Sequence, residues 1–385
     1  MDNWQQSGFG LYVHWPFCQS KCPYCDFNSH VSVSVDQSRW QRAFLSEIER
    51  MGQETPGRVL QTIYFGGGTP SLMEPELVSA ILEHARSTWS FANDIEITLE
   101  ANPGSVETGR FTGFREAGVN RVSMGLQAMN DADLKRLGRM HSVQDALLAF
   151  EIARKTFDRV SFDLIYARQD QTLKNWRNEL SLAIELAVDH LSLYQLTVED
   201  GTVFAARFAN GGLKGLPDED LSADMYKLTQ DVCGVAGLYA YEVSNHARTG
   251  MESRHNLIYW RGGDYAAIGP GAHGRISTAE GRFATEAPRS PEAWLSAVER
   301  RGNGDLSYQL LSTDECALEY LLMCMRLTEG MDIGKYNRLA SAPLKQGAIS
   351  HLEGLGMIRV TQDRLHATES GRLVLNAVIR ELAGA

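Results

Sequence analysis

The chain has 385 residues, of which 43% are hydrophobic and 22% are charged. This composition is that of a folded globular protein and disfavours disorder, a collagen-like repeat and a long coiled coil. Its 37 basic and 48 acidic residues give a net charge of −11, which disfavours binding to nucleic acid and to anionic membrane surfaces.

Neither a signal peptide nor a membrane-spanning segment is predicted. The first ten residues, MDNWQQSGFG, lack the basic start and apolar core of a secretory signal. The longest apolar run, around residues 317–327, contains Glu319 and Arg326 and is shorter than the roughly 18 apolar residues that a spanning helix needs. Six cysteines are too few for a disulfide scaffold. We therefore expect a cytoplasmic protein.

Short β-rich runs alternate with amphipathic segments from Gly10 to about residue 247. The predicted strands cover residues 11–14, 61–65, 94–100, 121–125, 159–165 and 190–195, with a less regular one at 239–244. The predicted helices cover residues 38–53, 74–89, 106–117, 142–155, 172–187 and 219–235. Six strand–helix units in succession predict an α/β fold with a parallel sheet, either doubly wound or a partial barrel. In both architectures, ligands bind at the carboxyl ends of the strands.

The alternation lapses in a Gly-rich, aromatic segment from Ser253 to Arg275. Beyond it, the predicted helices cover residues 291–300, 313–327 and 345–355, followed by a hairpin at 357–368 and a closing helix at 371–382. Helices followed by a small hairpin resemble a winged-helix module. The acidic balance and the absence of a basic recognition helix favour a packing or lid role for this module over DNA binding.

Three of the six cysteines have the spacing CxxxCxxC, at Cys18, Cys22 and Cys25, directly after the first predicted strand. Thiolates select zinc, copper(I) or iron–sulfur clusters. A structural zinc site normally takes a fourth Cys or His, for which His14 and His30 are near enough in sequence. A 4Fe-4S cluster normally takes four thiolates, so three leave one iron open for another ligand. The position after a strand of a βα series favours the cluster over zinc.

Other unusual residues also fall at the ends of predicted strands. GGGTP, from Gly66 to Pro70, follows the second strand, where residues without Cβ let backbone groups approach a ligand closely. Glu100 ends the third strand, Gln127 follows the fourth and Asp163 lies late in the fifth. These are the positions at which parallel sheets bind ligands.

The motif CxxxCxxC with an aromatic residue before its third Cys resembles the radical S-adenosylmethionine superfamily. In chain order, the phrases LYVHWPFC, IYFGGGTPS, LEANP, RVSMGLQ, LGRMHS and FDLIY resemble its oxygen-independent coproporphyrinogen oxidase-like group, over roughly residues 10–275. The C-terminal helices resemble the tail domain of that group. The resemblance implies a partial (β/α)6 barrel at residues 1–250, a connecting segment at 251–290 and a helical, winged-helix-like domain at 291–385.

The resemblance also implies cofactors and the residues that hold them. Cys18, Cys22 and Cys25 would bind a 4Fe-4S cluster whose open iron is chelated by exchangeable S-adenosyl-L-methionine. The positions that match S-adenosylmethionine contacts of the group are Tyr12, Tyr24, Gly67, Gly68, Thr69, Glu100, Gln127, Arg139 and Asp163. Arg139 would pair with the methionine carboxylate, Glu100 would accept from its ammonium, and Asp163 would accept from the ribose hydroxyls. The alternatives are helix caps or surface ions for the two acids and a solvated loop charge for Arg139.

Two functions within the group are open: a heme chaperone of the HemW type, and coproporphyrinogen III oxidase, an oxidoreductase of porphyrin biosynthesis. The oxidase pattern extends to CxxxCxxCxC, but Phe27 occupies the position of the fourth Cys. HNLIYW, which contains His255, Tyr259 and Trp260, resembles the HNxxYW signature of the chaperones, and these side chains suit heme iron and a porphyrin face. The alternative is a loop anchored by aromatic packing, with His255 hydrogen-bonded internally. The chaperone is favoured, and no residue is assigned a catalytic role.

The chaperone function implies heme and a heme-acceptor protein, of a respiratory kind, as partners, with a homodimer as a further expectation. Heme propionates in an acidic protein need a local cationic pocket. The arginines nearest to HNLIYW in sequence are Arg254, Arg261 and Arg275. His141 and His273 are weaker candidates for contact with a tetrapyrrole, because an isolated His is more often structural.

Overall fold

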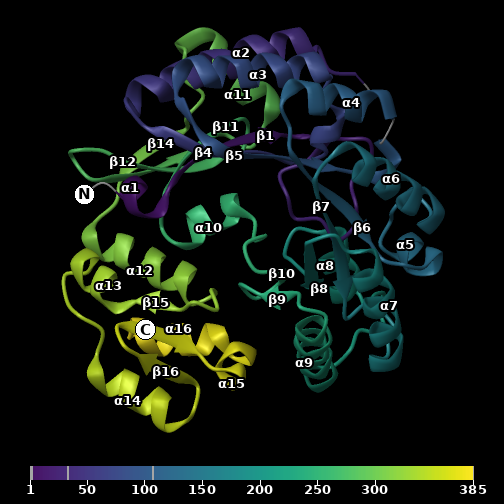
Figure 1. Ribbon diagram of the computed structural model, residues 1–385, viewed down its shortest axis with the longest axis vertical. Helices are drawn as coiled ribbons and strands as arrows, with labels where there is room; N and C mark the ends of the chain where they lie inside the picture. Colours follow the sequence, from purple (N-terminus) through teal and green to yellow (C-terminus); the bar gives the residue numbers. More distant parts are fainter. Residues whose placement is uncertain (1–2, 33, 106–107, 385) are drawn as a thin grey trace.

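The computed structural model describes residues 3–32, 34–105 and 108–384. Within these residues, a run of parallel strands is formed by β11 (Asp264–Ile268), β1 (Phe9–Trp15), β4 (Val59–Gly67), β5 (Ser90–Ala101), β6 (Arg121–Gln127), β7 (Arg159–Tyr166) and β8 (His190–Gln195). Antiparallel strands extend it at both ends: β12 (His273–Ser277), β13 (Arg282–Glu286), β14 (Ser307–Leu310), β10 (Asn245–Ala247) and β9 (Tyr239–Ala240). The sheet is curved but does not close, with the order β14-β13-β12-β11-β1-β4-β5-β6-β7-β8-β10-β9 (Figure 1). The prediction of a partial barrel is therefore confirmed.

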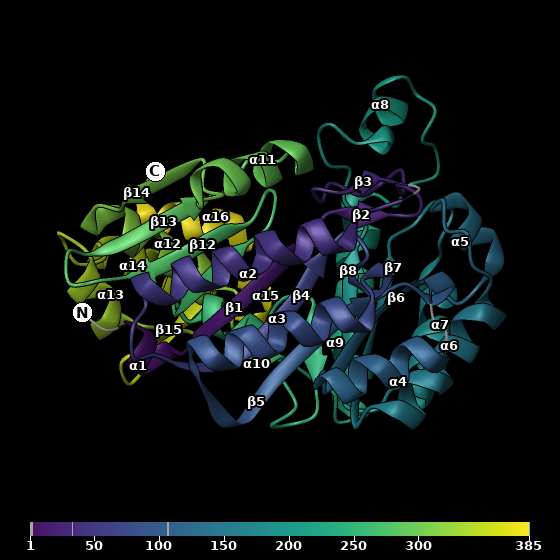
Figure 2. The ribbon, with the colours of Figure 1, turned by 90° about the horizontal axis from the view of Figure 1, so that it is seen from above.

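Helices cover the convex side of this sheet (Figure 2). They include α2 (Gln37–Glu54), α3 (Pro75–Thr88), α4 (Thr108–Ala117), α6 (Val143–Thr156), α7 (Leu173–Leu186) and α9 (Glu219–Val235). In α2, Trp40, Phe44 and Ile48 recur at helical spacing and are buried in the main core. The six helices agree with the predicted segments within a few residues. The first two residues of the helix predicted at 106–117 lie outside the described residues.

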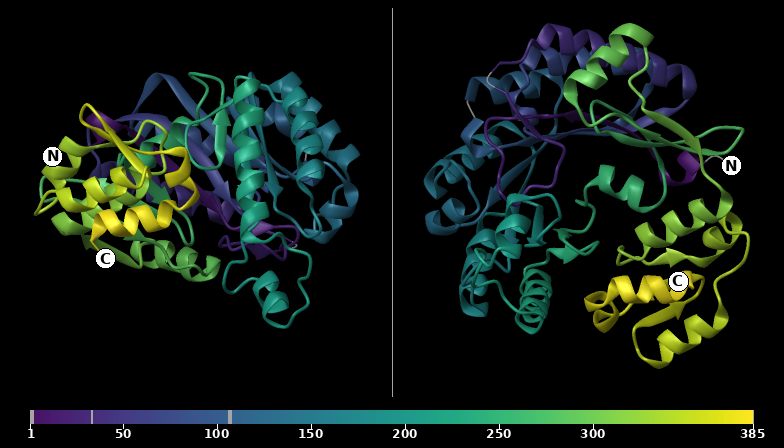
Figure 3. Two further views of the ribbon diagram at one scale, coloured as in Figure 1. Left: turned by 90° about the horizontal axis from the view of Figure 1, so that it is seen from below. Right: turned by 180° about the vertical axis from the view of Figure 1, so that it is seen from behind.

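The segment 251–290, expected to connect two units, contributes helix α10 (Arg254–Trp260) and strands β11, β12 and β13. α10 lies on the concave side of the sheet, between the sheet and the C-terminal helices (Figures 1 and 3). The helix expected to begin the C-terminal unit, α11 (Pro291–Arg301), packs against α2 instead, where the rings of Trp294 and Trp40 stack with centroids 5.3 Å apart. These residues therefore complete the main core.

The C-terminal unit has a separate core, which includes Leu321, Met325, Leu365 and Val378. Its helices are α12 (Thr313–Cys324), α13 (Ile333–Leu339), α14 (Gln346–Gly354), α15 (Glu369–Leu373) and α16 (Leu375–Ala383). They pack with a small antiparallel sheet of β15 (Met331–Asp332), β17 (Arg364–Ala367) and β16 (Ile358–Thr361). The predicted helical C-terminal domain with a hairpin is thus confirmed. Among the described residues, no helix is both long and apolar enough to cross a membrane.

The strand predicted at 239–244 forms two short strands instead. The chain turns at Glu242, whose carboxylate accepts hydrogen bonds from the backbone N of Ser244 (2.6 Å) and from Nδ2 of Asn245 (2.8 Å). After this turn, β10 runs antiparallel to β8 and places Asn245 opposite Ser192, whose hydroxyl donates to Oδ1 of Asn245.

Candidate functional site

A cavity of about 390 Å³, here called the strand-end cavity, lies at the carboxyl ends of the parallel strands. This is the edge at which parallel α/β sheets bind ligands. The predicted cluster ligands and cofactor contacts that line it are Cys18, Cys22, Tyr24, Cys25, Gly67, Gly68, Thr69, Glu100, Gln127, Arg139 and Asp163. The structure therefore brings together residues that are up to 145 positions apart in the sequence.

The three cysteines lie on a loop that is fixed at both ends. This Cys loop, residues 18–29, is bounded by β2 (Phe17–Cys18) and β3 (His30–Val31), which pair in parallel. The ring of His14 fastens the loop to β1, since its Nε2 lies 2.9 Å from the backbone O of Asn28. All three cysteines are free and partly exposed. The loop thus holds three thiols at the cavity wall.

GGGTP packs directly against the start of the Cys loop. The backbone N of Gly68 donates to the O of Trp15 (2.7 Å), and the N of Thr69 donates to the O of Phe17 (2.9 Å). A Cβ on Gly68 would lie 2.7 Å from that Phe17 oxygen, which is too close. The hydroxyl of Thr69 then donates to Sγ of Cys18 (3.4 Å). Close packing of two loops therefore requires this glycine, in addition to any approach of a ligand.

The donor chemistry of the three thiols fits an iron–sulfur cluster. Within the described parts of the chain, no group of three or more His, Cys, Asp or Glu side chains is close enough to bind a single metal ion. His14 is also engaged, because its Nδ1 bonds the hydroxyl of Tyr12 (2.9 Å) and its Nε2 the Asn28 carbonyl. A cluster takes one thiolate per iron, so its ligands surround a volume rather than a point. All three cysteines line the strand-end cavity, as this requirement demands.

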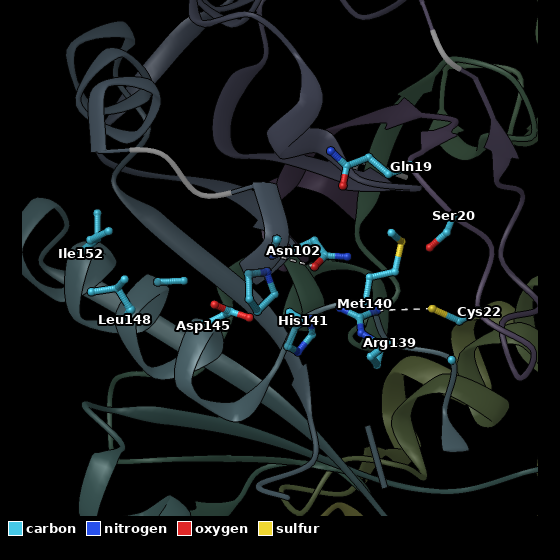
Figure 4. A pocket seen from close by; sticks show the side chains of 14 residues that line it. Gln19, Ser20, Cys22, Asn102, Arg139, Met140, His141, Asp145, Leu148 and Ile152 are labelled. Carbon is cyan, nitrogen blue, oxygen red and sulfur yellow. Dashed lines mark hydrogen bonds between the residues drawn. The ribbon is translucent and has the colours of Figure 1, made fainter. Parts of the chain in front are cut away.

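The side chain of Arg139 lines the cavity and contacts the Cys loop, so it is not a solvated loop charge. Its Nη2 donates to the backbone O of Gly125 (2.8 Å), and its Nη1 donates to Sγ of Cys22 (3.4 Å; Figure 4). Its Nε is buried and has no partner. Gly138, at φ +70°, lets this segment approach closely, because a Cβ there would lie 2.5 Å from the ring of Pro23. The guanidinium is thus held beside a predicted cluster ligand.

Glu100 and Asp163 lie in the cavity wall, so they are neither helix caps nor surface ions. Glu100 accepts from the hydroxyl of Tyr64 (2.7 Å) and from the backbone N of Gly67 (3.2 Å). Burial, together with the charge of the nearby Asp163, raises the pKa of Glu100 to about 7. Burial likewise raises the pKa of Asp163 to about 6. Two acids with raised pKa values in one cavity favour a cationic ligand, and S-adenosylmethionine carries an ammonium and a sulfonium.

Tyr12 and Gln127 differ in their relation to the cavity. Tyr12 lies under GGGTP, where a Cβ on Gly66 would be 2.9 Å from its ring, and it does not line the cavity. Gln127 lines the cavity at φ +74°, a conformation that few residues other than glycine adopt, at an irregularity in the pairing of β6 with β7. The cofactor contact of Tyr12 stays a prediction without a cavity to support it.

Helix α10 presents a different residue to the cavity from those predicted. His255 is 5% exposed; its Nδ1 lies 2.8 Å from the hydroxyl oxygen of Thr62, and its ring stacks on Tyr64 with centroids 5.1 Å apart. Burial lowers the pKa of His255 to about 3, so its ring is neutral. In the same motif it is Asn256 that lines the cavity. Sequence reasoning missed Asn256, although its place in HNxxYW was the available signal.

The other two aromatic residues of that motif pack with each other and with the C-terminal domain. The rings of Tyr259 and Trp260 have centroids 4.6 Å apart, and the guanidinium of Arg326 lies over Trp260 at 4.8 Å. Sγ of Cys324 donates to the Trp260 carbonyl (3.1 Å). These contacts match the alternative in which the segment is anchored by packing. The heme contacts of His255, Tyr259 and Trp260 stay a prediction.

The cationic pocket expected around HNLIYW is not formed by its neighbouring arginines, so this expectation is wrong. Each pairs with an acid: Arg254 with Asp94, Arg261 with Glu329 (2.7 Å) and Arg275 with Glu319 (2.9 Å). None of the three lines the strand-end cavity. The cations that do line it are Lys21, Arg121 and Arg139.

Comparisons with known proteins show the family to which the chain belongs. The model of the radical SAM superfamily matches residues 12–183, and that of the HemN C-terminal domain matches residues 311–374. The chain is 36% identical to the heme chaperone HemW of Escherichia coli, over 96% of each chain, and 40% identical to the mitochondrial radical S-adenosyl methionine domain-containing protein 1 of Bos taurus, over 83% of this chain and 74% of that one. The solved coproporphyrinogen III oxidase (HemN) of Escherichia coli shares the fold, with a TM-score of 0.82 at 22% identity, over 97% of this chain and 90% of that one. The chain therefore belongs to the HemW family of radical SAM proteins.

Proposed function

We propose that the protein is a heme chaperone, which binds heme and transfers it to an acceptor protein. The observation that carries this proposal is the match, over at least 95% of both chains, to proteins named heme chaperone HemW in Escherichia coli, Haemophilus influenzae and Mycobacterium tuberculosis. We further propose that it acts in the cytoplasm, that the acceptor is a respiratory heme protein, and that the chain forms a homodimer.

The proposal includes a 4Fe-4S cluster and exchangeable S-adenosylmethionine at the strand-end cavity. Cys18, Cys22 and Cys25 hold the cluster, which supplies an open iron and one-electron chemistry when bound. Glu100 and Asp163 offer carboxylates to the cationic groups of the cofactor. Residues 67–70 of GGGTP line the same cavity, and Tyr24 offers it an aromatic ring. We propose these roles from the cavity lining together with the family to which the chain belongs.

A hemin titration tests the chaperone function. The protein is reconstituted anaerobically with iron and sulfide, and hemin is added while the Soret band is recorded. We expect saturable binding that approaches one hemin per chain, followed by loss of the band from the protein when an apo-cytochrome acceptor is added. Absence of saturable binding would refute the proposal.

The same preparation separates the chaperone from the oxidase. Phe27 stands where the oxidase pattern has a fourth Cys, and its largely exposed ring lines the cavity. The likeness to the solved oxidase, at 22% identity, supports the fold alone. We therefore expect no protoporphyrinogen IX from coproporphyrinogen III with reductant and S-adenosylmethionine. Product formation at the rate of a genuine oxidase would overturn this expectation.

A further inference from the structure

A second cavity, of about 420 Å³, is lined by the side chains drawn in Figure 4. It adjoins the strand-end cavity. The two share a wall formed by Ser20, Cys22, Asn102 and Arg139. The remaining lining comes from the Cys loop, the turn after β5, residues 138–141 and helix α6. Apart from Arg139 and Cys22, none of the residues predicted to contact the cluster or S-adenosylmethionine lines this second cavity. It is therefore available to another ligand.

The wall contributed by α6 and the segment before it is apolar, and two of its side chains are largely exposed. Leu148, Ala149 and Ile152 line the cavity from α6, and Met140 lines it from the preceding loop. Met140 is 78% exposed and Leu148 is 63% exposed. Large apolar side chains that are this exposed beside a cavity suit a ligand with a flat apolar face.

The polar groups at the start of α6 are already occupied. Ser142 and Asp145 form a capping box, in which the Asp145 carboxylate accepts from the backbone N (2.9 Å) and the hydroxyl (2.7 Å) of Ser142. Although Asp145 lines the cavity, its carboxylate is thus committed to the helix. The capping box also fixes the first turn of α6, and with it the direction of the apolar wall.

His141 has features that are typical of a histidine that binds a metal. It is 6% exposed and lines the cavity next to Arg139 and Asn102 (Figure 4). Its Nε2 lies 3.3 Å from the backbone O of Leu126; a carbonyl only accepts, so Nε2 carries the hydrogen and Nδ1 keeps a lone pair. Burial, followed by the charge of Arg139, lowers the pKa of His141 to about 4, so the ring is neutral at pH 7. An imidazole whose other nitrogen is fixed by a carbonyl is the usual arrangement at metal sites.

We propose that this second cavity binds the heme of the proposed function, with Nδ1 of His141 as an axial ligand of the iron and the α6 wall against one porphyrin face. The thioether of Met140 at the rim is a second atom of a kind that heme iron accepts. This inference rests on the proposed function, and it places the cargo beside the Cys22 end of the cluster site.

The site contrasts with the one that the HNxxYW motif predicts. Nδ1 of His255 already bonds Thr62, its ring is stacked on Tyr64, and it lines neither of the two cavities described above. Iron ligation at His255 would have to break this packing. Ligation at His141 breaks no hydrogen bond that its side chain makes.

A pair of histidine variants tests the inference. In His141→Gln, the side-chain amide can still donate to the Leu126 carbonyl, but the nitrogen ligand is lost. In the matched control His255→Asn, the amide can still bond Thr62. We expect His141→Gln to bind hemin at least about tenfold more weakly, with a shifted Soret band and a changed ferric spin state by EPR, and His255→Asn to keep the wild-type spectrum. Unchanged affinity and spectrum in His141→Gln would overturn the inference, as would their loss in His255→Asn alone.

A second pair of variants tests the apolar wall of the second cavity and does not depend on the iron ligand. Leu148→Glu puts a charge on the apolar wall, and Leu182→Glu does the same on α7, where Leu182 is 52% exposed and lines neither cavity. We expect only Leu148→Glu to weaken hemin binding, by about tenfold. Equal affinity of the two variants would contradict the site. Failure of the wild-type protein to bind hemin would instead refute the chaperone proposal, so the two failures are distinguishable.

Discussion

The Cys loop and helix α10 border the same cavity, but their polar atoms are satisfied in different ways. In the Cys loop, Sγ of Cys18 accepts a long contact from Thr69 and Sγ of Cys22 accepts one from Arg139, and both cysteines line the cavity. In α10, His255 is bonded to Thr62 and covered by aromatic rings. A polar group that faces a cavity with few partners is available to a ligand. One whose bonds are complete is held as part of the structure.

The largest expected effect is on the iron content of the protein, and it comes from a substitution in the Cys loop. Cys22→Ala removes one of three thiolates, and a cluster with two ligands is not retained. We expect the iron and sulfide content after anaerobic reconstitution to fall to background, with loss of the visible absorption band. The control is Cys316→Ala in α12, a free cysteine that does not line the strand-end cavity and is expected to leave the iron content unchanged. A normal cluster in Cys22→Ala would contradict the assignment of these three ligands.

The next largest effect is on the stability of the protein, and it comes from a substitution in helix α10. His255→Ala leaves the buried hydroxyl of Thr62 without its partner and opens a gap against Tyr64. We expect the free energy of unfolding to fall by about 2–4 kcal/mol, with cluster content unchanged in the folded fraction. His255→Asn, which can keep the bond to Thr62, is expected to lose less than half of this. Chemical denaturation of the ligand-free protein measures both losses. A His255→Ala variant that is fully stable but no longer binds hemin would show that His255 contacts the ligand instead of holding the structure.

The comparison also explains which parts of the molecule can be predicted from sequence. The alternation of strands and helices is a local pattern, so the parallel sheet and its ligand-binding edge follow from it, and the Cys spacing is local as well. The place of α10 is not local, because it depends on the pairing of β11 with β1, more than 200 positions earlier, and on the contact of His255 with Thr62. The second cavity is likewise assembled from four separate segments.

Glu100, in the wall of the strand-end cavity, makes the free energy of unfolding depend on pH, and this effect is of intermediate size. The pKa of Glu100 is raised to about 7, so between its unfolded value of about 4.5 and pH 7 the folded protein binds more protons than the unfolded chain, and stability falls as the pH rises. Glu100→Gln removes this dependence. We expect the variant to gain about 1–3 kcal/mol relative to wild type between pH 5 and pH 8, on top of any constant offset from the bonds to Tyr64 and Gly67. Denaturation of the ligand-free proteins at both pH values measures the gain, and parallel pH profiles would show that Glu100 is not buried as described.

The smallest expected effect comes from the exposed end of α10. Arg261 pairs with Glu329 of the C-terminal domain, with both side chains more than one third exposed. Exposed ion pairs contribute little and are screened by salt, so Arg261→Gln should lower the free energy of unfolding by less than about 1 kcal/mol, and by less still at high salt. The backbone O of Arg261, which accepts from Nζ of the largely buried Lys335, is unaffected by the substitution. A larger, salt-independent loss would mean that the Arg261–Glu329 pair, and not the buried contacts of α10, holds the helix between the sheet and the C-terminal domain.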